Sequence, residues 1–174
     1  SYSYWLDSCG DDLTPRPALS GATEVDVAIL GAGFTGLWTA YYLLKHDPKL
    51  RVAVLEREIA GFGASGRNGG WCSALFPASM EKIAALSTRD QAIALQRAME
   101  RTIDEVGAVT AEHGIDCDFD KGGTVSLIRS GSQLMRARTE LEAAREWGRS
   151  EDDLRLLDVS EARERAGATN VLGA

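Results

Sequence analysis

The sequence feature that most constrains the fold is the stretch 25–36, VDVAILGAGFTG, in which an apolar run ends at a cluster of glycines. Residues 25–30 are mostly β-branched or aliphatic, which predicts a short buried strand. Apolar side chains then recur at helical spacing from Leu37 to Leu44, so we expect a helix that packs back on the sheet. The order strand, glycine turn, helix is typical of the first half of a dinucleotide-binding βαβ unit.

Each glycine of this turn has a separate task in a dinucleotide-binding unit. Gly31 allows a tight turn off the strand, Gly33 allows the backbone to approach a pyrophosphate, and Gly36 allows close packing of helix and strand. The helix begins near Phe34 and Thr35, where unpaired backbone N–H groups and the positive end of the helix dipole favour anions. The turn therefore predicts a phosphate-binding site.

The residues that follow support this interpretation over an unrelated glycine-rich turn. Residues 50–55, LRVAVL, predict a second strand, and Glu56 stands at its end, 20 positions after Gly36. A carboxylate at this place can accept hydrogen bonds from ribose hydroxyls and repels a 2′-phosphate, so FAD or NAD is favoured over NADP. The first 56 residues fit FAD and NAD equally well.

A second glycine-rich stretch covers residues 59–72, IAGFGASGRNGGWC. Its five glycines within ten residues exclude a regular strand or helix. Ser65, Arg67 and Asn68 add a hydroxyl, a guanidinium and an amide, which are donors suited to an anionic, hydrogen-bonding ligand. A flexible surface loop is the alternative, but the position directly after Glu56 favours a second cofactor contact.

Together, residues 31–36 (GAGFTG), Glu56 and residues 61–70 (GFGASGRNGG) resemble the FAD-dependent D-amino-acid oxidase superfamily, which includes glycine and sarcosine oxidases. The second string is most similar to the γ-glutamylputrescine oxidase-like branch. The resemblance implies FAD as cofactor, with the first glycines at its pyrophosphate and Glu56 at its adenosine ribose. It also implies that residues 64–70 run past the ribityl chain to the isoalloxazine ring. An amine or amino acid is the implied substrate, and the flavin carries the chemistry.

The candidate cofactor residues lie in the two loops and beside the ribose carboxylate; they are Gly31, Gly33, Phe34, Thr35, Gly36, Glu56, Arg57, Gly63, Ala64, Ser65, Arg67, Asn68, Gly69 and Gly70. Arg67 either neutralises pyrophosphate charge or forms a surface salt bridge. Arg57 either stacks near the adenine or points into water. Covalent attachment of the flavin stays open, since Cys72 is two residues beyond the loop. No catalytic acid or base is assigned in this part of the chain.

The rest of the sequence predicts an α/β chain with helices over 79–86, 88–113, 132–147 and 161–166, the last with Ser160 as N-cap. Residues 115–119 and 124–128 predict a hairpin of short strands. By resemblance, residues 1–114 are an arm and the Rossmann-like FAD-binding domain, and residues 115–174 begin an antiparallel-sheet substrate domain. The family's fold continues well beyond this point, so we expect an N-terminal fragment that is inactive as an enzyme by itself.

Composition narrows the possible partners and the location. A net charge of −7 disfavours nucleic acid and anionic membranes. No apolar run approaches the ~20 residues of a membrane span, and the first residues given lack a basic segment followed by an apolar one, so we expect a cytoplasmic protein. Cys9, Cys72 and Cys117 are widely spaced, which argues against a disulfide framework or a metal site.

Two other interpretations remain. An NAD-dependent dehydrogenase fits the first 56 residues, although residues 64–70 count against it. A module that binds nucleotide without turnover is also possible, because the substrate pocket would lie in the missing part. The N-terminal residues 1–23, with Tyr2, Tyr4 and Trp5, lack periodicity and are interpreted as an arm that lies over a domain, with a contact to substrate as the alternative.

Overall fold

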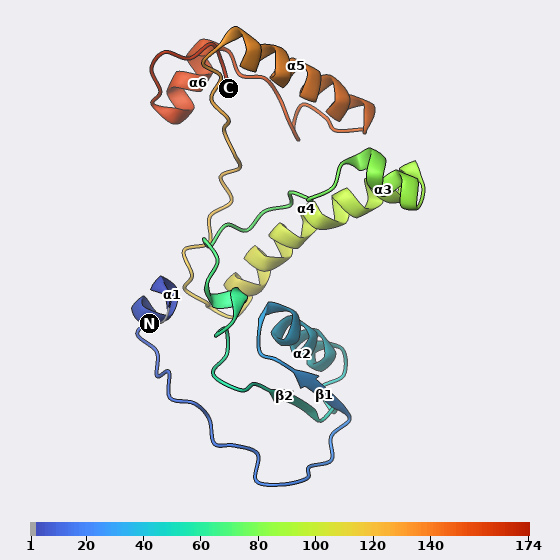
Figure 1. Cartoon of the computed structure of the whole chain (residues 1–174), viewed down its shortest axis with the longest axis vertical. Coiled ribbons are helices and arrows are strands. Elements are labelled where there is room, and N and C mark those ends of the chain that lie inside the picture. The colour runs from blue at the N-terminus through green and yellow to red at the C-terminus, as the bar shows by residue number, and fades with distance from the viewer. Residues whose placement is uncertain (1–2) are drawn as a thin grey trace. The chain divides into compact units, whose positions relative to one another are not determined.

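A computed structural model describes residues 3–174 and divides the chain into two compact units, Ser1–Trp71 and Cys72–Ala174. Unit 1 holds the only two strands of the described residues, and unit 2 is helical (Figure 1). Tyr2 lies outside the described residues. The predicted boundary at residue 114 concerns functional domains, and it stays a prediction.

Unit 1 is built on the predicted strand, helix, strand order. Strands β1 (Val27–Leu30) and β2 (Val52–Leu55) pair in parallel, with Val27 opposite Val52 and Leu30 opposite Leu55. Helix α2 (Phe34–His46) connects them and packs on one face of the pair (Figure 1). The α/β prediction and the βαβ unit are therefore confirmed.

The two faces of this small sheet differ in burial. Val27 and Ile29 are half-buried and alternate with exposed Ala28 and Leu30, the latter 83% exposed. Ile29 points toward α2, because a Cβ built on Gly36 would lie 3.2 Å from its Cγ2 atom. The apolar side chains of β1 therefore lie on both the face under α2 and an open face.

The N-terminal arm contains a short helix that the sequence analysis did not predict. Helix α1 (Tyr4–Ser8) begins after Ser3, whose hydroxyl accepts a 3.3 Å hydrogen bond from the N–H of Leu6. Residues 9–26 then run to β1 without regular structure. The second glycine-rich stretch is irregular as predicted, apart from the single 3₁₀ turn η1 (Ala64–Gly66).

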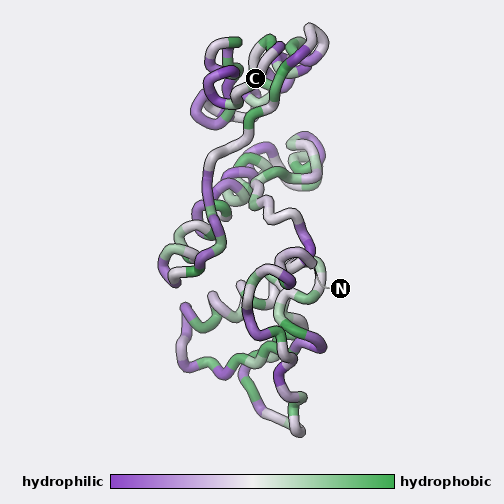
Figure 2. The backbone as a smooth tube through the Cα atoms, turned by 90° about the vertical axis from the view of Figure 1, so that its left-hand side faces the viewer, coloured by the Kyte–Doolittle hydropathy of each residue, from purple (hydrophilic) through white to green (hydrophobic). Residues whose placement is uncertain are grey.

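The helices of unit 2 are α3 (Met80–Leu86), α4 (Arg89–Glu112), α5 (Gly131–Glu146) and α6 (Val159–Ala166). All four lie close to predicted helices. Thr88 caps α4 by accepting a hydrogen bond of 3.2 Å from the N–H of Gln91. Around these helices, hydrophilic and hydrophobic positions alternate (Figure 2), and α3 packs against α4. None of the described helices combines the length and the apolar character needed to cross a membrane.

The predicted N-cap of the last helix, Ser160, is wrong. Helix α6 begins two residues earlier, after Asp158, whose carboxylate accepts a 2.9 Å hydrogen bond from the N–H of Glu161. The Glu161 side chain accepts a 3.0 Å hydrogen bond from the N–H of Asp158 in return. This reciprocal capping box satisfies two N–H groups at once, whereas a serine at position 160 could satisfy only one.

The predicted hairpin of residues 115–119 and 124–128 is also wrong. Asp118 has a positive φ of 51°, which breaks the extended backbone, and no strand occurs between residues 115 and 127. Only Ile128 pairs, through an isolated antiparallel bridge to Gly173 beside a small core that contains Leu157 and Val171. Among the described residues the one sheet is parallel, so the expected antiparallel sheet is absent from them. A strand is held by backbone hydrogen bonds to a neighbouring strand, and residues 115–127 pair with no strand among the described residues.

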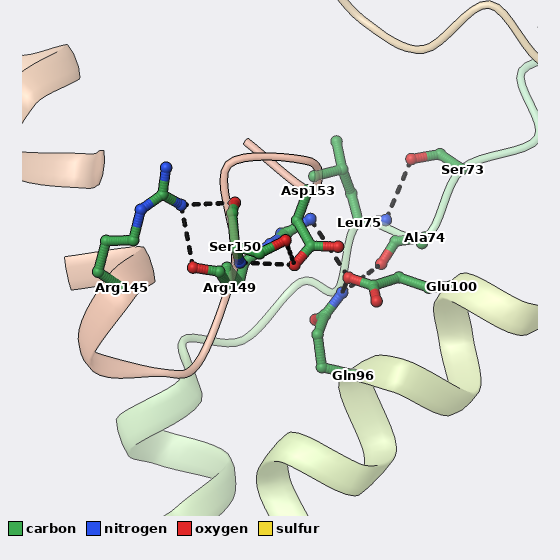
Figure 3. A network of polar contacts seen from close by, with 9 residues as sticks. All are labelled: Ser73, Ala74, Leu75, Gln96, Glu100, Arg145, Arg149, Ser150 and Asp153. Carbon is green, nitrogen blue, oxygen red and sulfur yellow. Dashed lines mark hydrogen bonds and ion pairs between the residues drawn. The ribbon is translucent and has the colours of Figure 1, made fainter. Parts of the chain in front are cut away.

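A polar network joins the turn after α5 to α4 (Figure 3). The Arg145 guanidinium donates to the carbonyl oxygens of Arg149 (3.0 Å) and Ser150 (2.6 Å). Arg149 forms an ion pair of 3.2 Å with Glu100, and Asp153 accepts a hydrogen bond of 2.7 Å from the N–H of Ser150. Most donors and acceptors are used to close the turn, so the network is structural. No group of three or more metal-ligating side chains occurs among the described residues.

Candidate cofactor site

Both candidate loops begin at the same edge of the parallel pair. The first loop follows the carboxyl end of β1 at Leu30, and Glu56 follows the carboxyl end of β2 at Leu55. Because the strands are parallel and in register, these ends are neighbours. The crevice outside the carboxyl ends of parallel strands is where open α/β sheets bind ligands.

The first turn requires glycine at two positions. Gly31 has a φ of +99°, and its N–H donates a 2.7 Å hydrogen bond to the Leu55 carbonyl, which extends the strand pairing by one residue. A Cβ on Gly36 would lie 2.0 Å from the carbonyl oxygen of Gly31, a distance that no side chain can adopt. The chain can therefore turn from β1 into α2 in so few residues only with glycine at both positions.

The N-terminus of α2 faces the second loop. Gly33 is its N-cap and offers no side-chain acceptor to the first-turn N–H groups. The first intrahelical hydrogen bond, of 3.0 Å, runs from the N–H of Leu37 to the Gly33 carbonyl. The N–H of Phe34 donates a 2.9 Å hydrogen bond to the Ser65 hydroxyl. The first-turn N–H groups, including those of Thr35 and Gly36, have no acceptor within the helix by its geometry. This end of the helix can therefore accept an anion.

Glu56 is tied to the same turn. Its Oε2 accepts a 2.9 Å hydrogen bond from the N–H of Ala32, and its Oε1 accepts one of 3.1 Å from the N–H of Glu58. These two backbone donors, Ala32 first, hold the pKa of the exposed Glu56 carboxyl below its ordinary value. A carboxylate oxygen has more than one lone-pair site, so Glu56 can also accept hydrogen bonds from ligand hydroxyls.

The second loop is fastened to the first and to itself. The N–H of Gly61 donates a 2.9 Å hydrogen bond to the Ala32 carbonyl. Together with the hydrogen bond between Ser65 and the N-terminus of α2, this makes two links between the loops. Within the loop, the Asn68 amide donates 2.7 Å to the Ser65 carbonyl and accepts 2.7 Å from the N–H of Gly70. The polar side chains of Ser65 and Asn68 therefore shape the loop in this structure.

Each of the two candidate arginines contacts a residue close to it in the sequence. The Nε of Arg67 donates a 2.8 Å hydrogen bond to the Phe62 carbonyl, and its guanidinium lies 4.9 Å from the Phe62 ring centroid. Arg57 is 87% exposed and pairs at 3.1 Å with Glu58. The built Cβ atoms of Gly63 and Gly69 would meet nothing within 4 Å, so the loop is open at these positions, and Ala64 is exposed beside them.

One residue at this site was missed by sequence reasoning. The indole of Trp5, in helix α1, donates a 2.6 Å hydrogen bond from Nε1 to the Asn68 carbonyl. The available signal was the aromatic cluster at the start of an aperiodic arm, which predicted contact with a domain but not its place. The structure assigns that contact to the second loop.

Comparison with known proteins extends the likeness to almost the whole chain. Residues 26–174 match the family model described as FAD dependent oxidoreductase. The "Probable oxidoreductase OrdL" of Haemophilus influenzae is 29% identical over 98% of this chain and 38% of its own length. The gamma-glutamylputrescine oxidoreductase of Escherichia coli is 29% identical over 99% of this chain and 39% of its own length. The chain thus spans less than two-fifths of either relative.

A shorter match concerns another class of protein. The thiamine thiazole synthase of Eremothecium gossypii is 44% identical over 50 residues, which is 29% of this chain and 15% of that protein. Its short extent contrasts with the matches to the two oxidoreductases, which cover nearly all of this chain.

Proposed function

This chain belongs to the family of FAD-dependent oxidoreductases, and from that premise we propose that unit 1 binds FAD at its two glycine-rich loops. We further propose that the protein oxidises an amine or amino acid at the C–N bond. The gamma-glutamylputrescine oxidoreductase among its relatives supports an amine as substrate.

The observation that carries the proposal is the pairing of an anion-accepting helix end with an anchored carboxylate. Gly33 has no side chain to block the N-terminus of α2, where first-turn N–H groups can donate to a pyrophosphate. Glu56, fastened to Ala32 of the same turn, can accept hydrogen bonds from the hydroxyls of the adenosine ribose. The donor set therefore fits the ADP half of FAD.

In this proposal the cofactor and the protein have separate roles. When bound, the flavin would supply the redox chemistry, the two-electron oxidation of the substrate C–N bond to an imine. Hydrolysis would then yield a carbonyl compound and an amine or ammonia, with O₂ or another acceptor taking the electrons. The residues of this chain bind and orient the cofactor: the α2 N-terminus holds phosphate, Glu56 holds ribose, and residues 64–70 line the path toward the ring.

The first test is a visible absorption spectrum of the purified protein before and after acid precipitation. Flavin bands in the supernatant indicate non-covalent FAD, and bands in the pellet indicate a covalent link. Protein that is colourless and takes up no added FAD would contradict the proposal. NAD binding in the same assay, without flavin, would instead support a dehydrogenase domain.

A matched pair of variants tests the site itself. The built Cβ of Gly33 lies 2.9 Å from the Ser65 hydroxyl, whereas that of Gly21 meets nothing within 4 Å. In a longer protein that contains this chain and spans the full length of its relatives, we expect Gly33→Val to abolish flavin uptake and amine-dependent peroxide formation, and Gly21→Val to preserve both. If Gly33→Val retains its full flavin content, the pyrophosphate does not bind at this turn. Flavin uptake without any amine oxidation in that longer wild-type protein would support a module that binds nucleotide without turnover.

A further inference from the structure

We infer that Trp5 is a positioning residue that holds the second loop in shape for the cofactor. The inference rests on the proposed function, because it assumes that residues 61–70 contact FAD. Trp5 and the loop both belong to unit 1, and they meet although 63 positions separate Trp5 from Asn68.

Trp5 makes two different contacts with the same tight turn. Its indole Nε1 donates a 2.6 Å hydrogen bond to the Asn68 carbonyl. Its six-membered ring lies against Gly70: a Cβ atom at position 70 would lie only 3.1 Å from Cζ2 of Trp5. Gly70 also has a φ of +74° and donates 2.7 Å to the Asn68 side chain. The indole ring therefore covers the turn at residues 68–70. It can approach this closely only because residue 70 is a glycine.

Helix α1 presents the indole in a restricted orientation. Ser3 caps the helix, and the N–H of Cys9 donates a 3.0 Å hydrogen bond to the Trp5 carbonyl. The Tyr4 ring contacts the Trp5 ring edge to face, with centroids 5.2 Å apart. Trp5 is 44% exposed, so more than half of its surface is covered.

The consequence for binding comes from chain entropy. A loop with five glycines in ten residues loses much conformational freedom when a ligand orders it. A contact that orders the loop beforehand removes part of this cost and so increases the affinity. Trp5 ties down residues 68 and 70, which flank the exposed Gly69. The arm thus raises affinity for FAD without having to touch it.

Limited proteolysis tests the contact without any cofactor. Trypsin can cleave after Arg67 in the loop, and cleavage after Lys49, in the turn between α2 and β2, serves as the internal reference. We expect Trp5→Ala to speed cleavage after Arg67 by about fivefold relative to Lys49, with Trp5→Phe intermediate, because loss of one hydrogen bond and its packing shifts local opening by about this factor. Unchanged cleavage at Arg67 in Trp5→Ala overturns the inference.

Titration of the apoprotein with FAD, followed by flavin fluorescence, tests the functional consequence. We expect Trp5→Ala to raise the Kd for FAD about threefold to tenfold, the effect of one lost hydrogen bond and its packing. The matched control is Trp147→Phe, which removes an indole hydrogen bond of 2.9 Å to Glu81 in unit 2. It should leave both the Kd and the cleavage after Arg67 unchanged.

The two experiments separate the possible failures. If the wild type binds no FAD, the proposed function fails, while proteolysis still decides whether Trp5 orders the loop. If Trp5→Ala speeds cleavage but leaves the Kd for FAD unchanged, FAD binding stands and the positioning role is overturned. A double-mutant cycle with Gly70→Ala adds a geometric check. The strain of a positive φ at residue 70 is the same in both backgrounds, but only the wild type has an indole that the new methyl group would contact. Gly70→Ala should therefore reduce the affinity for FAD less in Trp5→Ala than in the wild type.

Discussion

The Glu56 carboxylate accepts a 2.9 Å hydrogen bond from the backbone N–H of Ala32, 24 residues earlier in the chain. This bond joins the residue after β2 to the glycine turn after β1. One side chain therefore fixes the shape of the glycine turn and, in our proposal, holds the ribose. Its second oxygen is engaged by the N–H of Glu58 at 3.1 Å, so both oxygens are oriented before any ligand binds.

We expect Glu56→Ala to raise the Kd for FAD by roughly tenfold to a hundredfold, because hydrogen bonds to a charged acceptor are lost together with the anchor of the turn. Glu56→Gln keeps one acceptor oxygen and should lose less. The control is Glu58→Gln, which removes only the exposed ion pair with Arg57. Fluorescence titration with FAD measures all three variants, and an unchanged Kd in Glu56→Ala would remove Glu56 from the site.

Ser65→Ala should lower the free energy of unfolding of the apoprotein by about 1 kcal/mol, the usual cost of removing a side-chain acceptor at a helix N-terminus. The reason is that Gly33 offers no cap, so the N–H of Phe34 depends on the Ser65 hydroxyl. Ser73→Ala removes a hydroxyl that accepts only a local 3.1 Å bond from Leu75 and should have less effect. Urea denaturation compares the two, and equal losses would contradict a capping role.

Asp26 and Arg51 form a clasp where the two parallel strands begin. The Arg51 guanidinium donates to the Asp26 carboxylate at 2.9 and 3.2 Å, and the Arg51 N–H donates at 2.8 Å. The guanidinium first, and then this N–H, lower the pKa of Asp26 from 3.8 to about 2. Stability from the ionised carboxylate is therefore fully present above pH 3.8 and is lost as the pH falls through about 2.

Asp26→Asn should therefore be less stable than the wild type at pH 7, and the difference should shrink as the pH falls from 3.8 to about 2. Thermal unfolding at several pH values measures it. Arg51→Gln removes the partner and should show the same convergence. A gap between wild type and Asp26→Asn that stays constant down to pH 2 would show that the clasp does not lower this pKa.

Asp158→Ala should cost about 1 kcal/mol of stability, because it removes one half of the capping box of α6. Ser160→Ala, two residues later, removes a hydroxyl from the first turn of the same helix and should change stability by no more than about 0.5 kcal/mol. Chemical denaturation of the whole protein measures the free energy of unfolding of both variants. A larger loss in Ser160→Ala would restore the N-cap predicted from the sequence.

Local patterns in the sequence predicted much of unit 1 correctly. The glycine spacing and the strand patterns identified the βαβ unit, and the two loops identified the family, which the match over residues 26–174 confirms. These signals are readable because turns, caps and close approaches depend on residue type within a few positions. The helices of unit 2 were predicted for the same reason, since their caps and apolar stripes are local.

The errors and omissions involve partners that are distant in the chain or compete locally. The predicted hairpin failed because residues 115–127 have no strand partner among the described residues, and Asp118 interrupts their extension. Asp158, not Ser160, is the N-cap of α6, because its reciprocal capping box with Glu161 satisfies more backbone N–H donors. For the candidate cofactor residues, the pattern indicated the ligand class, while contact with FAD stays a prediction.

The sequence by itself determined which backbone positions of the first turn must be glycine and that a carboxylate follows the second strand, because those features depend on local φ values and on spacing along the chain. Only the tertiary structure decided that Glu56 is anchored to Ala32, that Ser65 supplies the cap that Gly33 lacks, and that Trp5 lies on the turn at Gly70. Each of these contacts joins residues more than 20 positions apart. Such pairs are set by how the elements pack in space, and no local pattern encodes them.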